Sequence, residues 1–489
     1  MAQYVLSGAG ASDGRIAFEV PSVNGAPAKT LSYGTLRTHV KGIATGLLSH
    51  GLRPGDRLLF RLGNRLEFPL AYLAALYVGI IPVPTSAQLT APEVAALCQI
   101  CQPQAILTDG STALPERSAL PLITTDLLRD MHALPPAHPV MGDPDRLAYI
   151  IFTSGTSGTP RGVCHAHRAI WARRMMHQGW YGLSTADRML HAGAFNWTYT
   201  LGTGLMDPWS VGATALVTPE GTPVSALPQI LAENNISIFA AAPGVYRQML
   251  RHPFPPKMPA LRHGLSAGEQ LPETTRTLWE RTTRAMIHEA LGMSECSTFI
   301  SGSPTHPARP GTSGRPQPGR RVAILNDAAP APFDTPGELA IAATDPGLML
   351  GYLGAAPLSQ NWFRTGDMAQ MAPDGSVTYL GRADDMMNAG GYRVSPLEVE
   401  GAMSDAPNLT ACAATALSPK PDTTVIALFY TGQADEQTLR AHAAEKLARY
   451  KQPRLYIPLA SLPYGPNGKL NRRALRDGYE AQHDRNDPA

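Results

Sequence analysis

The sequence has almost no net charge. Among its 489 residues, 41 are Lys or Arg and 39 are Asp or Glu, which gives a formal net charge of +2 at pH 7. Such a balance provides no broad positive field that would hold a nucleic acid or an acidic lipid surface. Any contact with a polyanion must therefore be local, and we expect no nucleic-acid partner.

The sequence also lacks a long uninterrupted hydrophobic run. The longest uncharged stretch, residues 68–92, is interrupted by Gly79, Pro82 and Pro84. These breaks favour a buried helix followed by a strand over a membrane span. Residues 1–14 contain neither the basic segment nor the apolar segment of an export signal. We therefore expect a cytoplasmic protein with no membrane partner.

Cysteine is scarce, and its count of five is odd. An odd count in a long chain argues against a disulfide framework. Cys98 and Cys101 have CxxC spacing, but no second pair follows and no thioredoxin-like tryptophan or proline flanks them. We expect these two cysteines to be reduced residues on one face of a helix.

What the sequence does contain is an alternation of helical and strand-like segments. Residues 35–51 and 67–80 have apolar side chains at helical spacing, whereas residues 57–62 are typical of a strand. This alternation predicts a sheet, mostly parallel, that is covered by helices. The chain of 489 residues is too long for one hydrophobic core, and its length suggests roughly two to four domains.

The residue composition and pattern of the sequence change towards the carboxyl terminus. From about Gly302 onwards, Pro/Gly-rich turns separate short strands, which predicts a small β-rich region. After "GRADD" comes a compact α+β unit of roughly a hundred residues, an ordinary domain size. We expect an α/β fold with two domains: a large one at 1–381, with helix-covered sheets and a β-rich subdomain, and a small α+β one at 382–489.

The most distinctive stretch is "TSGTSGTPRG" at 153–162, which directly follows the apolar run "LAYIIF". A strand that enters a loop of glycines and small hydroxyl residues can direct backbone amides towards the oxygens of a phosphate. A solvent-exposed linker has a similar composition. The loop is not of the GxxxxGK[ST] kind, because Pro160 and Arg161 stand where Gly and Lys are needed.

This loop closely resembles the phosphate loop of the acyl-adenylate-forming superfamily, which includes acyl-CoA synthetases, adenylation domains of nonribosomal peptide synthetases, and luciferases. Further stretches resemble motifs of that family in the family's order. The resemblance extends from about Leu31 to Leu475, and its motifs are "GLSAGEQLP" (264–272), "HEALGMSE" (288–295), "WFRTGDMA" (362–369), "YLGRADDMMNAGGYRVSPLEVE" (379–400) and "PNGKLNRRAL" (466–475).

The resemblance implies an AMP-forming carboxylate ligase that uses ATP, Mg²⁺ and coenzyme A. It implies catalytic roles for Lys469, Glu295 and Arg393, with Glu295 also as the Mg²⁺ ligand. It further implies that Asp367 accepts hydrogen bonds from the ribose and that Arg382 reaches the ribose. The full set expected to bind ATP or AMP is Thr153, Ser154, Gly155, Thr156, Ser157, Gly158, Arg161, Ala267, Gly268, Glu269, Leu291, Gly292, Met293, Ser294, Asp367 and Arg382.

The resemblance also implies a conformational change between two half-reactions. Asp384 would be the hinge about which a mobile C-terminal domain rotates after adenylation. Gly390 and Gly391 would leave room for the pantetheine arm of coenzyme A. Taken without the resemblance, the Arg-Ala-Asp-Asp run is a charged turn and the glycine pair is a simple turn.

By the same resemblance, the acyl pocket is expected to be formed by Phe195, Asn196, Trp197, Tyr199 and Ala241. Peptide-synthetase domains usually have an aspartate where Asn196 stands, and a neutral amide disfavours an amino-acid substrate. Trp197 and Tyr199 can stack on an aryl acid, shorten the pocket for a small aliphatic acid, or belong to the core. Aryl and short-chain acids both remain open.

The chain departs from the family's usual motifs at several positions. Arg161 replaces the loop lysine, Leu291 replaces an aromatic residue, Ser294 replaces a threonine and Asn388 replaces a frequent lysine. The Leu291 and Asn388 choices are more similar to short-chain and aryl-CoA ligases of the benzoate-CoA ligase type. The expected partners are a small carboxylic acid, ATP and coenzyme A, with a carrier protein as the alternative acceptor. A monomer and a homodimer both remain open.

Overall fold

The computed structural model describes residues 1–22, 28–116, 119–154, 160–218, 221–327, 329–389, 392–420, 423–465 and 470–483. The chain divides into two compact units, and the expected mixed α/β fold is confirmed. The first unit comprises Met1–Arg321 and Ala342–Phe363, and the second comprises Val322–Ile341 and Arg364–Ala489. The functional division between residues 381 and 382 stays a prediction.

A small parallel sheet lies early in the first unit. It contains β3 (Arg57–Arg61), β4 (Ile81–Pro84), β5 (Ala105–Thr108) and β6 (Leu122–Thr124) in the order β4-β3-β5-β6. The helices that alternate with these strands are α2 (Tyr33–Ser49), α3 (Glu67–Tyr77), α4 (Ala91–Cys101) and α5 (Thr125–Asp130), and α1 (Ala2–Ser7) precedes them.

The sequence explains why these helices form where they do. The side chain of Ser32 accepts a hydrogen bond from the backbone N–H of Thr35 and thereby caps α2 at its start. Apolar residues at helical spacing then direct one face of α2 into the core. Helix α3 is buried at every position after Glu67, so the long uncharged stretch is a buried helix followed by a strand, as expected.

A larger, mostly parallel sheet carries the predicted adenine segment and part of the predicted acyl pocket. Its order is β15-β14-β13-β12-β11-β9-β10-β1-β2, and neighbours from β1 through β10, β9, β11 and β12 to β13 are parallel. The carboxyl ends of these strands therefore share one edge. The strands are β1 (Ile16–Val20), β2 (Lys29–Ser32), β9 (Arg188–His191), β10 (Thr214–Leu216), β11 (Ile238–Ala241), β12 (His263–Ala267), β13 (Met286–Met293), β14 (Ser297–Ser301) and β15 (Arg315–Pro316).

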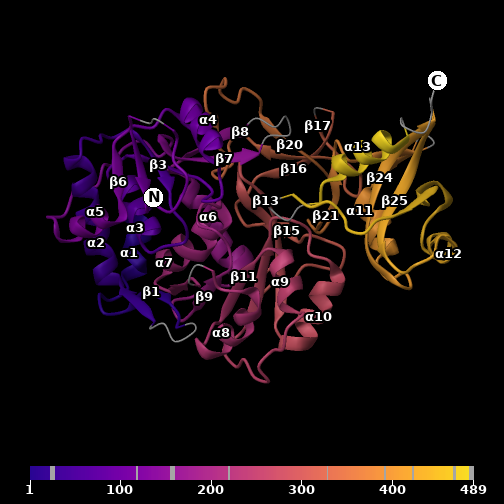
Figure 1. Ribbon diagram of the computed structural model, residues 1–489, viewed down its shortest axis with the longest axis horizontal. Helices are drawn as coiled ribbons and strands as arrows, with labels where there is room; N and C mark the ends of the chain where they lie inside the picture. Colours follow the sequence, from indigo (N-terminus) through magenta and orange to yellow (C-terminus); the bar gives the residue numbers. More distant parts are fainter. Residues whose placement is uncertain are drawn as a thin grey trace. The chain divides into compact units, whose positions relative to one another are not determined.

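Helices cover both faces of this sheet. On one face, α8 (Leu227–Glu233), α9 (Pro243–Met249) and α10 (Glu273–Thr283) pack against β9 and β11 (Figure 1). On the other face, the core includes residues of α6 (Ala169–Met176) and of two π-helical turns, η3 (His177–Tyr181) and η4 (Tyr199–Met206). Helix α7 (Asp207–Val211) directly follows η4.

A separate antiparallel sheet presents the Gly/Ser/Thr loop. Strands β7 (Leu147–Ser154) and β8 (Pro160–Ala166) form a hairpin around this loop, and β19 (Gly351–Tyr352) pairs with β8. The loop therefore leaves the end of a buried strand, as the sequence predicts.

The second unit contains an antiparallel region and an α+β part, with three sheets among its described residues. An antiparallel region contains β16 (Val322–Asn326), β17 (Ala329–Pro330), β18 (Gly337–Ala342), β20 (Trp362–Met371) and β21 (Val377–Arg382) in the order β17-β16-β18-β20-β21. The α+β part contains β22 (Met387–Ala389), β23 (Tyr392–Val394), β24 (Leu409–Lys420), β25 (Thr423–Gly432), β26 (Leu455–Pro458), α11 (Pro396–Met403), α12 (Glu436–Lys446) and α13 (Arg472–His483). In this part, the half-buried Glu400 carboxylate accepts hydrogen bonds from the Arg472 Nη2 at both of its oxygens.

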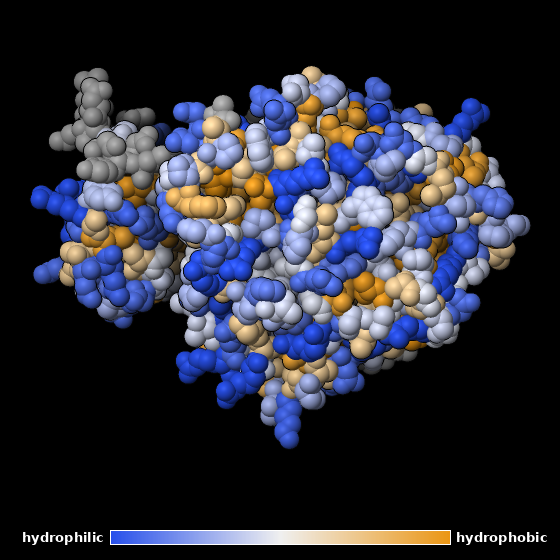
Figure 2. Space-filling view, turned by 180° about the vertical axis from the view of Figure 1, so that it is seen from behind, coloured by the Kyte–Doolittle hydropathy of each residue, from blue (hydrophilic) through white to orange (hydrophobic). Residues whose placement is uncertain are grey.

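The surface hydropathy, the helices and the cysteines can be compared with the expectations from composition. On the face drawn in Figure 2, hydrophobic patches alternate with hydrophilic side chains. Among the described residues, no helix is both long enough and apolar enough to span a bilayer. All five cysteines are free thiols, and Cys98 and Cys101 lie on α4, as expected.

Candidate active site

The phosphate-loop hairpin brings Thr153 and Arg161 together. These residues face each other across β7 and β8, and Ser154 faces Pro160 in the same register. Four other residues of the predicted loop, and the Ser154 side chain, lie outside the described part of the chain: Gly155, Thr156, Ser157 and Gly158. Their phosphate-binding role stays a prediction.

The predicted catalytic carboxylate, Glu295, lies in the tight turn between β13 and β14. The backbone N–H of Met349 donates to the carbonyl of Glu295 at 2.8 Å. The His165 Nε2 lies 2.7 Å from the carbonyl oxygen of Ser294. Burial lowers the pKa of His165 to about 4, so the ring is neutral at pH 7 and its Nε2–H donates this bond. The turn is therefore tied to β8, the strand that follows the phosphate loop.

The Glu295 side chain contacts a residue that sequence reasoning did not identify. The Tyr352 hydroxyl donates to the Glu295 Oε1 at 2.8 Å. The guanidinium carbon of Arg161 lies 3.4 Å from the centroid of the Tyr352 ring. A planar guanidinium stacks on an aromatic face as an ammonium cannot. Arg161, which stands where the family usually has a loop lysine, thus lies on the tyrosine that orients the predicted catalytic carboxylate.

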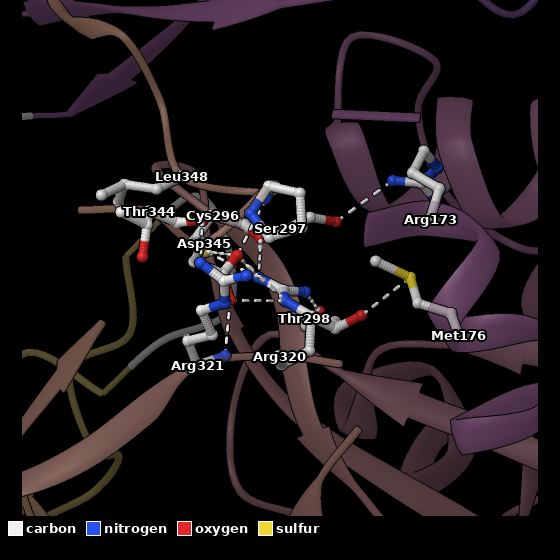
Figure 3. Close-up of polar contacts among 12 residues, drawn as sticks. Arg173, Met176, Cys296, Ser297, Thr298, Arg320, Arg321, Thr344, Asp345 and Leu348 are labelled. Carbon is white, nitrogen blue, oxygen red and sulfur yellow. Dashed lines mark hydrogen bonds and ion pairs between the residues drawn. The ribbon is translucent and has the colours of Figure 1, made fainter. Parts of the chain in front are cut away.

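Two buried arginines hold the rest of this turn (Figure 3). Arg320 donates to the carbonyl oxygens of Cys296 and Thr298, and its side chain and that of Asp345 are 0% exposed. Arg173 donates to the Ser297 hydroxyl at 3.1 Å and pairs with a buried aspartate, Asp207. The low local dielectric strengthens these charge-assisted bonds. The backbone on the carboxyl side of Glu295 is therefore fixed from two directions.

The predicted adenine segment adjoins the predicted acyl segment. Ala267 ends β12 and pairs with Ala290 of β13. Gly268 has φ 103°, a backbone conformation that favours glycine. A Cβ on Gly268 would lie 3.4 Å from the Trp197 ring, so the indole lies against this segment. Glu269 and four residues near the end of β13 are half-buried at the same edge of the sheet: Leu291, Gly292, Met293 and Ser294.

Within the acyl segment, Tyr199 is enclosed by aromatic rings. Its ring centroid lies 5.7 Å from that of Trp180 and 6.2 Å from that of Trp197. Its hydroxyl donates to the carbonyl of Leu265 at 3.1 Å. This bond fixes the ring beside the end of β12, which carries the adenine segment.

The other acyl-pocket candidates have different surroundings. Phe195 is buried against Phe68, with ring centroids 5.5 Å apart, whereas Asn196 is half-buried. Ala241 belongs to the core beneath α8 to α10. A further residue, Asn64, fixes this loop, because its Nδ2 donates to the Gly193 carbonyl and its Oδ1 accepts from the Phe195 N–H. Sequence reasoning did not identify Asn64.

In the second unit, Asp367 and Arg382 face each other across β20 and β21. The Arg382 Nη1 donates to the Asp367 Oδ1 at 3.2 Å, and the Tyr379 hydroxyl donates to the same oxygen at 3.1 Å. Burial raises the pKa of Asp367, and the Arg382 charge and the Tyr379 hydrogen bond oppose that rise. The predicted ribose acceptor is therefore a buried carboxylate whose ionisation depends on its neighbours.

The remaining predictions concern the carboxyl-terminal part of the second unit. Asp384 is exposed and forms an ion pair with Arg382 at 3.6 Å. The backbone of Arg393 pairs with Asn388 between β23 and β22, but both side chains lie outside the described part. Gly390, Gly391 and Lys469 also lie outside it. Their predicted roles stay predictions.

The described residues contain no group of three or more His, Cys, Asp or Glu side chains that would hold a metal by itself. Glu295 alone still fits the predicted ion, because Mg²⁺ binds through one or two carboxylates together with phosphate oxygens and water. The Tyr352 hydroxyl uses only part of the acceptor capacity of this carboxylate, which could still bind a cation.

Most of the chain matches the model of one known protein family. The AMP-binding enzyme family matches residues 10–353. The chain belongs to this family. The superfamily predicted from the motifs is confirmed.

This AMP-binding enzyme has curated relatives of similar length. It is 25% identical over 490 residues to a 3-hydroxybenzoate–CoA ligase of Aromatoleum sp. (strain CIB), covering 93% of this chain and 92% of the relative. It is 28% identical over 464 residues to a benzoate–CoA ligase of Thauera aromatica, covering 87% and 86%. A benzoate CoA ligase structure from Burkholderia xenovorans LB400 has a TM-score of 0.83 and 26% identity, covering 97% and 99%. The family and these relatives identify the chain as an AMP-forming ligase of the acyl-CoA synthetase class.

Proposed function

We propose that this enzyme activates an aryl carboxylic acid as acyl-AMP and transfers the acyl group to the thiol of coenzyme A. The observation that carries the proposal is the position of Trp197. Its indole lies between the adenine segment at Gly268 and the enclosed ring of Tyr199. Aromatic walls beside the nucleotide suit a flat ring, which stacks on them. The relatives named as ligases of benzoate and 3-hydroxybenzoate support this choice over a short-chain acid.

In the first half-reaction, a carboxylate oxygen attacks the α-phosphorus of ATP, a P–O bond forms and pyrophosphate leaves. Two anions must approach each other, so the protein contributes positioning and charge. Mg²⁺ held by Glu295 would neutralise charge on the phosphate oxygens. Tyr352 and Met349 hold the side chain and the carbonyl of Glu295 in place before the nucleotide arrives.

Other residues of the chain would orient and stabilise the same step. Asp367, with one oxygen already held by Tyr379 and Arg382, would accept hydrogen bonds from the ribose hydroxyls. Residues 153–158 and Arg161 would hold the phosphates of ATP. Lys469 would bridge the attacking carboxylate and the α-phosphate, and Arg393 would contact the phosphate.

In the second half-reaction, the thiol attacks the acyl carbon, a thioester C–S bond forms and AMP leaves. We propose that residues 382–489 act as the mobile domain for this step, with Asp384 as the hinge. Gly390 and Gly391 would admit the pantetheine arm close to the backbone. A carrier-protein thiol is the alternative acceptor.

The test is to measure pyrophosphate release from Mg-ATP with benzoates, cinnamates and short aliphatic acids, each with and without coenzyme A. The expected result is turnover with an aryl acid that rises sharply with coenzyme A, together with accumulation of acyl-CoA. The K469A variant serves as the negative control, with an expected loss of about 10²- to 10³-fold in rate. A single burst of pyrophosphate that coenzyme A leaves unchanged would contradict the proposed acceptor and favour a carrier protein.

A further inference from the structure

The carboxyl edge of the large sheet carries one side chain to which no motif assigns a role. His191 is the last residue of β9, and its backbone pairs with Ala240 of β11. Alternation along β9 places His191 on the same face as Met189, which packs with Tyr199 and Ala267. Ligands of parallel sheets bind at this edge. His191 therefore lies on the side of the sheet that carries the acyl and adenine segments.

His191 and its neighbour Thr200 have unpaired polar atoms in the interior. His191 is 1% exposed and Thr200 is 0% exposed. Within the described part of the chain, both His191 ring nitrogens and the Thr200 hydroxyl lack a hydrogen-bond partner. Buried polar groups are nearly always paired, and leaving one unpaired costs about 1–3 kcal/mol. Two such side chains in one place therefore indicate a missing partner.

One unpaired atom of each side chain lies beside Gly193. A Cβ on Gly193 would lie 2.3 Å from the Thr200 Oγ1 and 3.1 Å from the His191 Nδ1. The His191 ring also meets Tyr199 edge to face, with centroids 4.3 Å apart. Thr200 lies in the π-helical turn η4, a distortion that is frequent at functional sites. The polar pair is thus adjacent to the aromatic wall of the proposed acyl pocket.

The charge of these groups restricts the kind of partner. Burial lowers the pKa of His191 to about 3, so the ring is neutral at pH 7 and presents one donor and one acceptor. The Thr200 hydroxyl also donates and accepts. The nearby cation, Arg173, is already neutralised by Asp207. A second carboxylate on the acid would therefore find no free charge, whereas a hydroxyl group matches both partners.

We infer that His191 and Thr200 form a specificity subsite that receives a ring hydroxyl of the acyl substrate. The enzyme then selects a hydroxybenzoate over unsubstituted benzoate. This inference rests on the proposed aryl-CoA ligase function. His191 and Thr200 determine specificity and take no part in the transfer of the acyl group.

The test compares kcat/KM for benzoate, 3-hydroxybenzoate, 4-hydroxybenzoate and the two corresponding fluorobenzoates. Fluorine fills part of the space of a hydroxyl without donating a hydrogen bond. The wild-type enzyme is expected to prefer one hydroxybenzoate over benzoate by about tenfold or more, since one paired buried hydrogen bond contributes about 1.4 kcal/mol. The matching fluorobenzoate is expected to behave like benzoate.

Three variants test whether His191 and Thr200 cause the preference for a ring hydroxyl. H191L is expected to bring the hydroxybenzoate-to-benzoate ratio close to one while benzoate turnover persists. T200V, which has nearly the same shape as the wild type, is expected to reduce the ratio in part. H263L is the matched control, because His263 is a buried histidine at the start of β12, which β11 separates from β9, and its Nε2 is also unpaired among the described residues. It is expected to leave the ratio unchanged.

The outcomes separate this inference from the proposed function. Turnover of benzoate with no preference for a hydroxyl would overturn the subsite alone, and so would an equal loss on all acids in H191L. Absence of turnover with every aryl acid would overturn the subsite and the proposed function together. If H191L fails to fold, H191N, which keeps a donor and an acceptor, is expected to keep part of the preference.

Discussion

Among single residues, the hydrogen bond from Tyr352 to Glu295 leads us to predict how the Y352F variant depends on Mg²⁺. In Y352F the Glu295 carboxylate loses the hydrogen bond that orients it, but the Arg161 guanidinium keeps a ring to stack on. We expect the Mg²⁺ concentration that gives half-maximal activity to rise about three- to tenfold, since one such bond contributes about 1 kcal/mol. A Mg²⁺ titration at saturating ATP measures this shift.

The matched control for Y352F is Y72F. The Tyr72 hydroxyl is buried and has no hydrogen-bond partner among the described residues, so its removal breaks no contact seen in the structure. Y72F is expected to leave the Mg²⁺ titration unchanged. An unchanged titration in Y352F would show that Tyr352 does not position the metal ligand.

The ion pair of Asp367 and Arg382 leads us to predict how the pH profile of activity changes in an Arg382 variant. Burial raises the pKa of Asp367, and the Arg382 charge opposes this rise by stabilising the carboxylate. Replacing Arg382 by Gln removes that charge, so the pKa of Asp367 must rise further. In the proposed role the ionised form accepts hydrogen bonds from the ribose, so the acidic limb of kcat/KM for ATP is expected to move to higher pH. A pH profile of R382Q with its acidic limb unmoved would contradict the assigned role.

At the scale of structural elements, the turn between β13 and β14 depends on the buried pair of Arg320 and Asp345. D345N leaves the arginine buried without its counter-charge, and we expect it to lower the free energy of unfolding by about 3–5 kcal/mol. The double variant R320M/D345L removes both charges and is expected to recover most of that stability. Urea unfolding followed by fluorescence measures both changes.

Activity measurements distinguish two roles of Arg320 and Asp345: stabilising the fold and holding the turn that carries Glu295. In the double variant, the carbonyls of Cys296 and Thr298 lose their donor, so the Glu295 turn loosens even though the fold is stable. We expect kcat to stay about tenfold or more below the wild-type value, because small displacements of a catalytic group are costly. A stable double variant with wild-type kcat would show that the pair serves stability alone.

The elements also show which features the sequence can predict. Helix α3, strand β4 and the strand β7 that precedes the Gly/Ser/Thr stretch follow from local patterns, because apolar spacing and turn residues act within a few positions. Glu295 and Asp367 could be proposed as site residues from the sequence because their motifs are short and contiguous, and their roles stay predictions. Tyr352, Asn64 and the pair of Arg320 and Asp345 could not, since each acts through a residue at least 25 positions away. Single-sequence patterns do not encode such distant contacts.

At the scale of the whole molecule, buried neutral histidines link stability to pH. Burial lowers the pKa of several to values between about 3 and about 4, whereas an unfolded histidine titrates near 6.5. Below pH 6.5 the unfolded chain binds more protons than the folded chain, so stability must fall as the pH falls. These residues are His165, His167, His191, His263 and His288.

We therefore expect Tm to decrease steadily between pH 7.5 and pH 5.5. Each histidine contributes up to about 1.4 kcal/mol per pH unit once the unfolded form is protonated. Carboxyl groups with raised pKa values, such as Glu289 and Glu400, act in the opposite direction at lower pH. H263L, which lacks one of the histidines, is expected to show a shallower decrease. A Tm that is flat across this range would contradict the assignment of neutral buried rings.

The central claim is that this chain joins an acid to a thiol through an acyl-AMP intermediate. The most direct test uses benzoate or a hydroxybenzoate labelled with ¹⁸O in both carboxylate oxygens, with ATP and coenzyme A, and mass spectrometry of the products. One carboxylate oxygen becomes bonded to the α-phosphorus and stays there when the thiol displaces it. The account predicts one ¹⁸O in AMP, none in pyrophosphate and one in the acyl-CoA thioester. Unlabelled AMP, or label in inorganic phosphate beside ADP, would contradict it.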